Sequence, residues 1–250
     1  MEPRRIFDTI PEKFDKWRPR YCSEAFEALI ARTGLGPGKT VLEIGPGTGQ
    51  ATEPILKTGC DYLAIELGGH LAGFMRDKFS GYPNFRIVNA DFETCDFGGE
   101  KFDLVFSASA IQWIPEALAF TRSLELLKSG GTLAMMVLRG DYRTPDEALY
   151  DEIESVYDEY FRPEIPYTRK FDYGRAADYG FAGLQKLEFH SQREYTADDY
   201  VEYLGTHSDH IVLKEPFRSK FFGGVRAAIL RHGNRLVFSD TVILFLARKA

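Results

Sequence analysis

The chain has 250 residues, enough for one domain with elaborations and a full hydrophobic core. With 44% hydrophobic and 27% charged residues, its composition is that of an ordered globular protein. The formal net charge of −6, together with the lack of a long basic run, argues against nucleic acid as a partner.

Cysteines and apolar runs restrict the class of protein further. The three cysteines are widely spaced and form no Cys-x-x-Cys pair, so we expect neither a disulfide framework nor a metal site. The N-terminus has no apolar signal core and no apolar run reaches the length of a membrane span, so we expect no membrane partner. A cytoplasmic protein is the simplest interpretation.

The first half of the chain predicts the fold class. Residues 1–38 precede the first strand and include a helical stretch near 23–32. Residues 39–138 alternate strands with helices, which predicts an α/β fold with a Rossmann-like, doubly wound and mostly parallel sheet. The strands of this part are expected at 41–44, 61–66, 85–90, 102–107 and 132–137.

Residues 139–250 break this alternation. Helical stretches are expected near 145–160, 197–204 and 215–232. A strand is expected near 184–194, and the chain ends on a strongly apolar strand at 241–249.

A glycine-rich turn follows the first strand. Residues 41–50 read Val-Leu-Glu-Ile-Gly-Pro-Gly-Thr-Gly-Gln. Because Gly45, Gly47 and Gly49 lack a Cβ, a ligand can approach the backbone there. A helix expected from Gln50 onward points its N-terminus at the same place. A strand, a glycine turn and a helix in this order predict a nucleotide-type site at the carboxyl edge of the sheet.

The spacing of the glycines discriminates between nucleotide cofactors. A nicotinamide fingerprint, Gly-x-Gly-x-x-Gly, needs a glycine at position 50, where this chain has Gln50. Glu43, two residues before the first glycine, would repel a diphosphate and attract a cationic amino group. The pattern favours a cofactor with an amino group, and a plain glycine-rich turn is the alternative.

Acidic residues at the next two strand ends extend the predicted site. Glu66 ends the second strand, near the usual spacing for an acid that accepts both hydroxyl protons of a ribose. Asp91 follows the third strand and could accept a hydrogen bond from an exocyclic amine, while Phe92 covers a purine face. The sequence thus predicts positions for a ribose and an adenine along one sheet edge.

With these motifs, residues 39–138 resemble the class I S-adenosylmethionine-dependent methyltransferases. The chain is most similar to their small-molecule branch, which includes trans-aconitate methyltransferase-like enzymes. The resemblance implies S-adenosyl-L-methionine as cofactor and an antiparallel C-terminal strand in the same sheet. It also implies a lid over the sheet edge, formed by residues 1–38 and by helical insertions within 139–250.

The resemblance also implies roles for single residues. The glycine turn would cradle the methionine part of the cofactor, Glu43 its ammonium group and Glu66 its ribose. Ala108 would offer its carbonyl to the amino-acid end. The cofactor-binding residues implied are Tyr21, Glu43, Gly45, Gly47, Gly49, Glu66, Leu67, Asp91, Phe92 and Ala108. The segment 67–70 departs from the family pattern, since it lacks a polar helix cap and predicts a flexible helix start.

Catalytic residues are harder to predict, because methyl transfer by in-line displacement depends mainly on positioning and on exclusion of water. Gln112 and Trp113 follow the fourth strand and are expected to face cofactor and acceptor. Gln112 cannot act as a base, and core packing is as good an explanation of Trp113. His207 is the candidate general base, with a surface position as the alternative.

The acceptor is expected to be a small organic molecule enclosed beneath the lid. Arg18, Arg139 and Arg143 could pair with a carboxylate on it, and Trp113 could pack against it. Each arginine could instead be a solvated surface residue. Two other functions stay open, a nicotinamide-dependent oxidoreductase and a cofactor-binding protein without catalysis. A monomer and a homodimer fit the sequence equally well.

Overall fold

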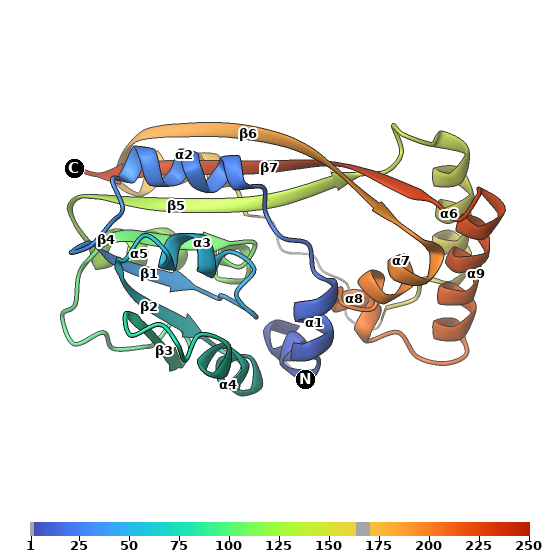
Figure 1. The fold of residues 1–250 in the computed structure, drawn as a ribbon, viewed down its shortest axis with the longest axis horizontal. Coiled ribbons are helices and arrows are strands. Elements are labelled where there is room, and N and C mark those ends of the chain that lie inside the picture. Colours follow the sequence, from blue (N-terminus) through green and yellow to red (C-terminus); the bar gives the residue numbers. More distant parts are fainter. Residues whose placement is uncertain (1–2, 164–170) are drawn as a thin grey trace.

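One seven-stranded sheet forms the centre of the structure, a computed structural model that describes residues 3–163 and 171–250 (Figure 1). The strand order is β3-β2-β1-β4-β5-β7-β6. Neighbours among β1 to β5 pair in parallel, whereas β7 pairs antiparallel with both β5 and β6. The predicted Rossmann-like sheet with an antiparallel C-terminal strand is confirmed. The strands are β1 Thr40–Ile44, β2 Asp61–Glu66, β3 Phe85–Asn89, β4 Phe102–Ala108, β5 Leu127–Asp141, β6 Phe181–Tyr195 and β7 Leu236–Lys249.

Helices cover both faces of this sheet, because successive strand residues point to opposite sides. On one face Val41 and Phe106 pack in a cluster with residues of α2, α3 and α4. On the other face Leu42 and Val105 pack with residues of α5. The helix predicted from Gln50 begins two residues later. These helices are α2 Ser23–Thr33, α3 Thr52–Leu56, α4 Gly69–Lys78 and α5 Glu116–Leu126, and the 3₁₀ helices η2 Ile111–Trp113 and η3 Tyr173–Tyr179 lie beyond β4 and before β6.

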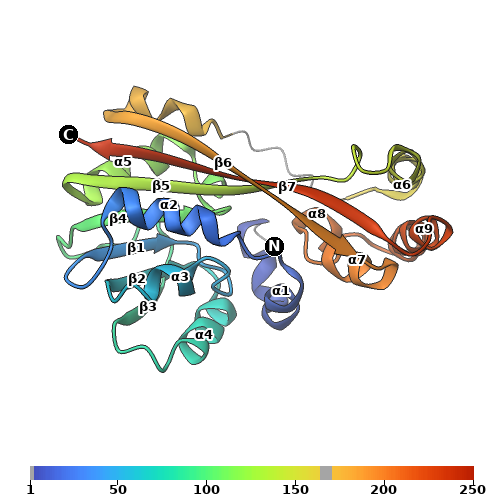
Figure 2. The same ribbon diagram turned by 45° about the horizontal axis from the view of Figure 1, so that its top comes forward.

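The N-terminal segment, made of η1 Pro3–Thr9 and α1 Pro11–Trp17, lies beyond the carboxyl ends of the central strands (Figures 1 and 2). It contacts α4 of the core on one side and α7 and α8 on the other. The segment therefore sits where the sequence places the cofactor site.

Three long strands, β5, β6 and β7, continue past the core and carry a group of helices at their far end (Figure 2). The pairing of β5 with β7 extends to Asp141 and Ser239, whereas β4 ends at Ala108, opposite Met136. This helical group, called the lid below, consists of α6 Glu147–Tyr160, α7 Ala197–Leu204, α8 Ser208–Ile211 and α9 Phe217–Arg231. The lid has its own hydrophobic cluster, which includes Ile153 and Phe221. No helix in the described ranges is long and apolar enough to cross a membrane.

Candidate functional site

Three glycines shape the turn after β1. Gly45, Gly47 and Gly49 have φ angles of +64°, +61° and +83°, a left-handed conformation that other residues rarely adopt. A Cβ at Gly45 would lie 2.6 Å from the Cβ of Ala110, and one at Gly47 would lie 3.2 Å from Cε1 of Phe14. The turn thus needs glycine both for its backbone and for the close approach of α1 and of the segment after β4.

Alanine at Gly49 is expected to destabilise the protein by about 1–3 kcal/mol more than alanine at Gly99. Both glycines have a φ of +83°, so the backbone strain is matched. A Cβ at Gly49 would lie 2.6 Å from Cε2 of Phe79 and 2.9 Å from Sδ of Met75, whereas one at Gly99 meets nothing within 4 Å. Urea unfolding of the two variants measures the difference, and equal stabilities would show that the turn relaxes without cost.

Glu43 is a buried carboxylate near the end of β1, with 1% of its surface exposed. Its Oε2 accepts hydrogen bonds from Oγ1 of Thr52 at 2.6 Å and from the hydroxyl of Tyr62 at 2.8 Å. Burial raises the pKa of Glu43 to about 7, although these two hydrogen bonds favour its charged form. A cationic group beside it would favour the carboxylate further.

Glu66, at the end of β2, holds the glycine turn and the start of α4 together. Its Oε2 accepts from the backbone N–H of Gly47 at 3.1 Å and its Oε1 from that of Gly68 at 2.9 Å. Burial raises the pKa of Glu66 to about 7 as well. Two buried carboxylates with raised pKa values therefore flank the glycine turn.

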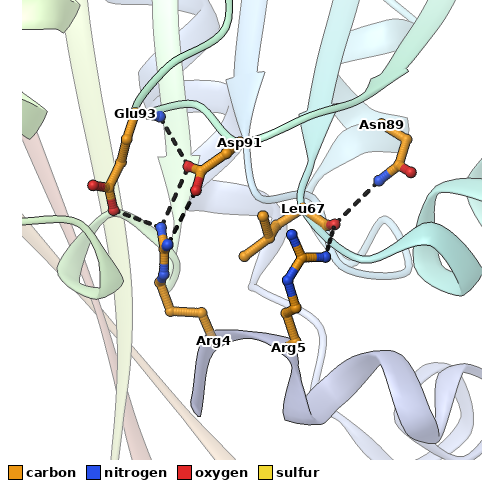
Figure 3. Close-up of polar contacts among 6 residues, drawn as sticks. All are labelled: Arg4, Arg5, Leu67, Asn89, Asp91 and Glu93. Atoms are coloured by element: carbon orange, nitrogen blue, oxygen red, sulfur yellow. Dashed lines mark hydrogen bonds and ion pairs between the residues drawn. The ribbon is translucent and has the colours of Figure 1, made fainter. Parts of the chain in front are cut away.

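Two arginines of the N-terminal segment reach residues predicted to bind the cofactor (Figure 3). The guanidinium of Arg4 pairs with both oxygens of Asp91, at 3.0 and 3.3 Å, and with Glu93. Nη1 of Arg5 donates to the carbonyl of Leu67 at 3.0 Å. Two residues predicted to bind the cofactor, Asp91 and Leu67, are thus in contact with η1.

Asp8, also in η1, caps helix α4. Its Oδ1 accepts from the backbone N–H of Leu71 at 2.9 Å, and a Cβ at Gly68 would lie 2.4 Å from the same oxygen. The carbonyl of Leu67 also accepts from Nδ2 of Asn89 (Figure 3). Segment 67–70 has no side-chain cap of its own, as expected, but Asp8, which is distant in sequence, supplies one.

A cavity of about 480 Å³ connects the glycine turn to the lid. Both buried carboxylates line it. Aromatic and basic residues of the N-terminal segment cover one side, and residues of α7 and α8 close the far end. The lining residues used below are Arg4, Phe7, Phe14, Arg18, Glu43, Glu66, Arg193, Tyr203, His207, Ser208 and Asp209.

Most of the residues predicted for the cofactor and acceptor sites line this one cavity. They are Arg18, Tyr21, Glu43, Gly45, Gly47, Glu66, Leu67, Asp91, Phe92, Ala108, Gln112, Trp113 and His207. Gly49 lies under the turn instead, facing Phe79. Arg139 and Arg143 are not among the described residues that line the cavity, and Nη2 of Arg143 pairs with Glu147 at 3.5 Å.

Among the catalytic candidates, Gln112 and Trp113 have structural contacts. Nε2 of Gln112 donates to the carbonyl of Ser109 at 2.9 Å, and its Oε1 accepts from the hydroxyl of Tyr173 at 3.1 Å. The ring of Trp113 packs edge-on against Phe7, with centroids 5.6 Å apart. Both side chains thus shape the cavity wall, and neither can exchange a proton near neutral pH.

His207 lies at the lid end of the cavity. Its Nδ1 is 3.2 Å from the carbonyl of Leu204, which can only accept, so Nδ1 carries the proton and Nε2 is left with its lone pair. Burial, and then the nearby guanidinium of Arg18, hold the pKa of His207 well below its usual value. A neutral imidazole therefore lines the cavity at neutral pH.

Several lining residues were missed by sequence reasoning. Arg4, Phe7 and Phe14 belong to the N-terminal segment, and Arg193 and Tyr203 to β6 and α7. The segments that carry them are distant in sequence from the glycine motif. No spacing or periodicity in the sequence indicates that they meet.

The comparisons with known proteins agree with this geometry. Residues 42–135 match the methyltransferase domain family. Ribosomal RNA small subunit methyltransferase A of Dehalococcoides mccartyi (strain CBDB1) is 43% identical over 63 residues, which are 25% of this chain and 22% of that protein. Malonyl-[acyl-carrier protein] O-methyltransferase of Marinomonas sp. (strain MWYL1) is 30% identical over 136 residues, 53% of this chain and 50% of that protein. The chain thus spans at most about half the length of these curated relatives.

A solved structure extends the similarity beyond the matched domain. Phosphoethanolamine N-methyltransferase 2 of Haemonchus contortus, in a complex that contains S-adenosylhomocysteine, aligns with a TM-score of 0.59 and 16% identity. The alignment covers 100% of this chain and 60% of that protein, and it shows a shared fold.

Proposed function

We propose that this chain, whose residues 42–135 match the methyltransferase domain family, uses S-adenosylmethionine to transfer a methyl group to a small organic acceptor held in the cavity. The observation that carries the proposal is the continuity of that cavity. It runs from Glu43 and Glu66 at the strand ends to His207 in the lid. Its volume of about 480 Å³ is within the range usual for small-molecule sites.

The residues present fit the cofactor. Glu43 offers a buried carboxylate to its ammonium group, and the glycine turn leaves room beside the backbone for the amino-acid end. Glu66 can accept from ribose hydroxyls, and Asp91 with Phe92 can hold adenine. When bound, S-adenosylmethionine supplies an activated methyl group, so these side chains need only bind, orient and exclude water.

A base is required only for an acceptor that is protonated at neutral pH. His207 is suited to that role, since its Nε2 is unprotonated and the residue lines the cavity. Because its pKa is low, the imidazole of His207 is already neutral at neutral pH, and it can accept a proton without first losing one. The cavity walls formed by Gln112 and Trp113 would hold the acceptor in line with the methyl group.

Nucleic acid is the alternative acceptor, because the first relative is named for ribosomal RNA. That relative is similar over only 63 residues, and this chain has a net charge of −6. Residues of the N-terminal segment and of the lid line the cavity, which favours an acceptor small enough to fit between them.

The cofactor assignment is tested by thermal unfolding with S-adenosylmethionine, S-adenosylhomocysteine and NAD. Either of the first two, at 100 times its dissociation constant, is expected to add about 2.7 kcal/mol of stability, and NAD none. Stabilisation by NAD alone would instead support an oxidoreductase. Binding of S-adenosylmethionine without turnover on small acids, phenols or amines, but with methylation of ribosomal RNA, would refute the small acceptor.

A further inference from the structure

Arg18 is a partly buried cation in the cavity wall that forms no ion pair with a described residue. It follows α1, and its Nη2 donates to the carbonyl of Thr206 in the lid at 2.8 Å. Its Nε is buried and has no hydrogen-bond partner. Across residues 3–163 and 171–250, no carboxylate lies within 4.0 Å of its guanidinium. The N–H groups of Nε and Nη1 are therefore unused.

N–H groups without hydrogen-bond partners are unusual for a guanidinium in the aromatic surroundings of Arg18. Its guanidinium carbon lies 5.1 Å from the ring centre of Phe14, 5.9 Å from that of Phe7 and 6.0 Å from that of Tyr203. Burial lowers the pKa of Arg18, which reflects the cost of removing its charge from water. Aromatic faces offset only part of that cost, so a partly buried cation of this kind is normally paired.

The other arginines that line the described cavity are paired. Arg193 forms a two-pronged ion pair with the buried carboxylate of Asp240. Arg4 pairs with Asp91 and Glu93. Among the cavity-lining arginines of the described chain, the lack of an ion pair is thus specific to Arg18.

Nearby groups leave room for an anion. Asp209 also lines the cavity, but its Oδ1 is 2.8 Å from Nδ1 of His210, and it forms no ion pair with Arg18. His207 is neutral and Ser208 has a hydroxyl that can donate. Glu43 and Glu66 are at the opposite end, in β1 and β2. Asp209 interacts electrostatically with Arg18, so the lid end has one carboxylate beside a guanidinium that forms no ion pair, whereas Glu43 and Glu66 are both at the opposite end.

We propose that the acceptor carries an oxyanion, a carboxylate or a phosphate monoester, that pairs with Arg18 at the lid end of the cavity. This inference rests on the proposed function and specifies its substrate class. The unused N–H groups of Arg18 would receive the oxyanion, and the Nη2 bond to Thr206 would keep the guanidinium in place. Pairing would also connect the N-terminal segment to the lid through the acceptor.

Matched acceptor pairs test the proposal in the wild-type protein. Each pair consists of a small carboxylic acid or phosphate monoester and its neutral amide or alcohol, assayed by transfer of a radiolabelled methyl group. We expect kcat/KM for the charged member to exceed that for the neutral one by about tenfold or more. Acids and phosphate esters are scored separately, which identifies the oxyanion. Equal or better turnover of the neutral members would overturn the proposal.

Variants test whether Arg18 causes the preference for the charged member of each acceptor pair. Arg18→Gln is expected to abolish the preference for the charged member, Arg18→Lys to keep part of it, and Arg20→Gln to leave it unchanged. Arg20 is the matched control, because it is exposed and pairs with Asp15 at 2.9 Å. Calorimetry with S-adenosylhomocysteine should give affinities within about twofold of wild type for all three.

Direct binding of benzoate and of inorganic phosphate to the S-adenosylhomocysteine-loaded protein, followed by NMR, covers the case in which no panel member is turned over. Weaker binding to Arg18→Gln than to wild type supports the site, and equal or absent binding to both refutes it. A wild-type protein that binds no S-adenosylhomocysteine would instead refute the proposed function.

Discussion

Replacing Glu66 with alanine is expected to weaken S-adenosylmethionine binding by about 1.5–3 kcal/mol, the usual contribution of hydrogen bonds to a charged group. The variant loses the proposed acceptor for the ribose hydroxyls. It also releases the backbone N–H groups of Gly47 and Gly68, which Glu66 holds at 3.1 and 2.9 Å. Isothermal calorimetry measures the change directly.

Glu100→Ala is the matched control for this variant, since Glu100 is exposed, forms an ion pair with Arg86 and does not line the described cavity. It should bind the cofactor as wild type does. Glu66 lies at a strand end, so the alanine variant should remain folded by circular dichroism. Unchanged affinity in a folded Glu66→Ala protein would show that another residue holds the ribose.

Cofactor affinity is expected to rise about tenfold or more between pH 6 and pH 8. The pKa values of Glu43 and Glu66 are both raised to about 7, so both carboxyls are largely protonated at pH 6. A ligand with a cationic amino group binds the ionised form better, so binding lowers the pKa of Glu43 and releases a proton. Calorimetry in buffers of different ionisation enthalpy counts the protons released.

The stability of the ligand-free protein should fall as the pH rises, whereas cofactor affinity should rise. Each carboxyl has an ordinary value of 4.5 and a folded value of about 7, so the folded state binds protons more tightly. This contribution to stability is complete below pH 4.5 and is lost as the pH rises through 7. Glu43→Gln should reduce the pH dependence both of cofactor affinity and of the stability of the ligand-free protein. A cofactor affinity that is independent of pH in wild type would contradict this account.

The cofactor half of the site could be predicted because one physical rule positions it. Glu43, Glu66 and Asp91 lie at or beyond the carboxyl ends of parallel strands, and such ends share one edge of the sheet. The hydrophobic pattern of the strands and the glycine spacing were enough to place them. Their binding roles remain proposals.

The acceptor half could be predicted only in part: Arg18, Trp113 and His207 were expected there and line the cavity, whereas Arg193 was missed. Arg18 reaches the cavity because α1 folds between core and lid, and Arg193 because β6 extends past the core. Arg139, which the sequence suggested, lies opposite Thr241 in the β5–β7 ladder and does not contribute to the described cavity wall. These outcomes depend on long-range packing, which leaves no periodic signal in the sequence.

The separate hydrophobic cluster of the lid has a consequence for how such a protein can change over evolution. The lid cluster and the two clusters that flank the sheet have no residue in common. Substitutions distant from one another and without shared partners usually have additive effects on stability. Selection can therefore remodel the lid for a new acceptor while the cofactor-binding half keeps its sequence and its stability, so one inherited scaffold can acquire different substrates.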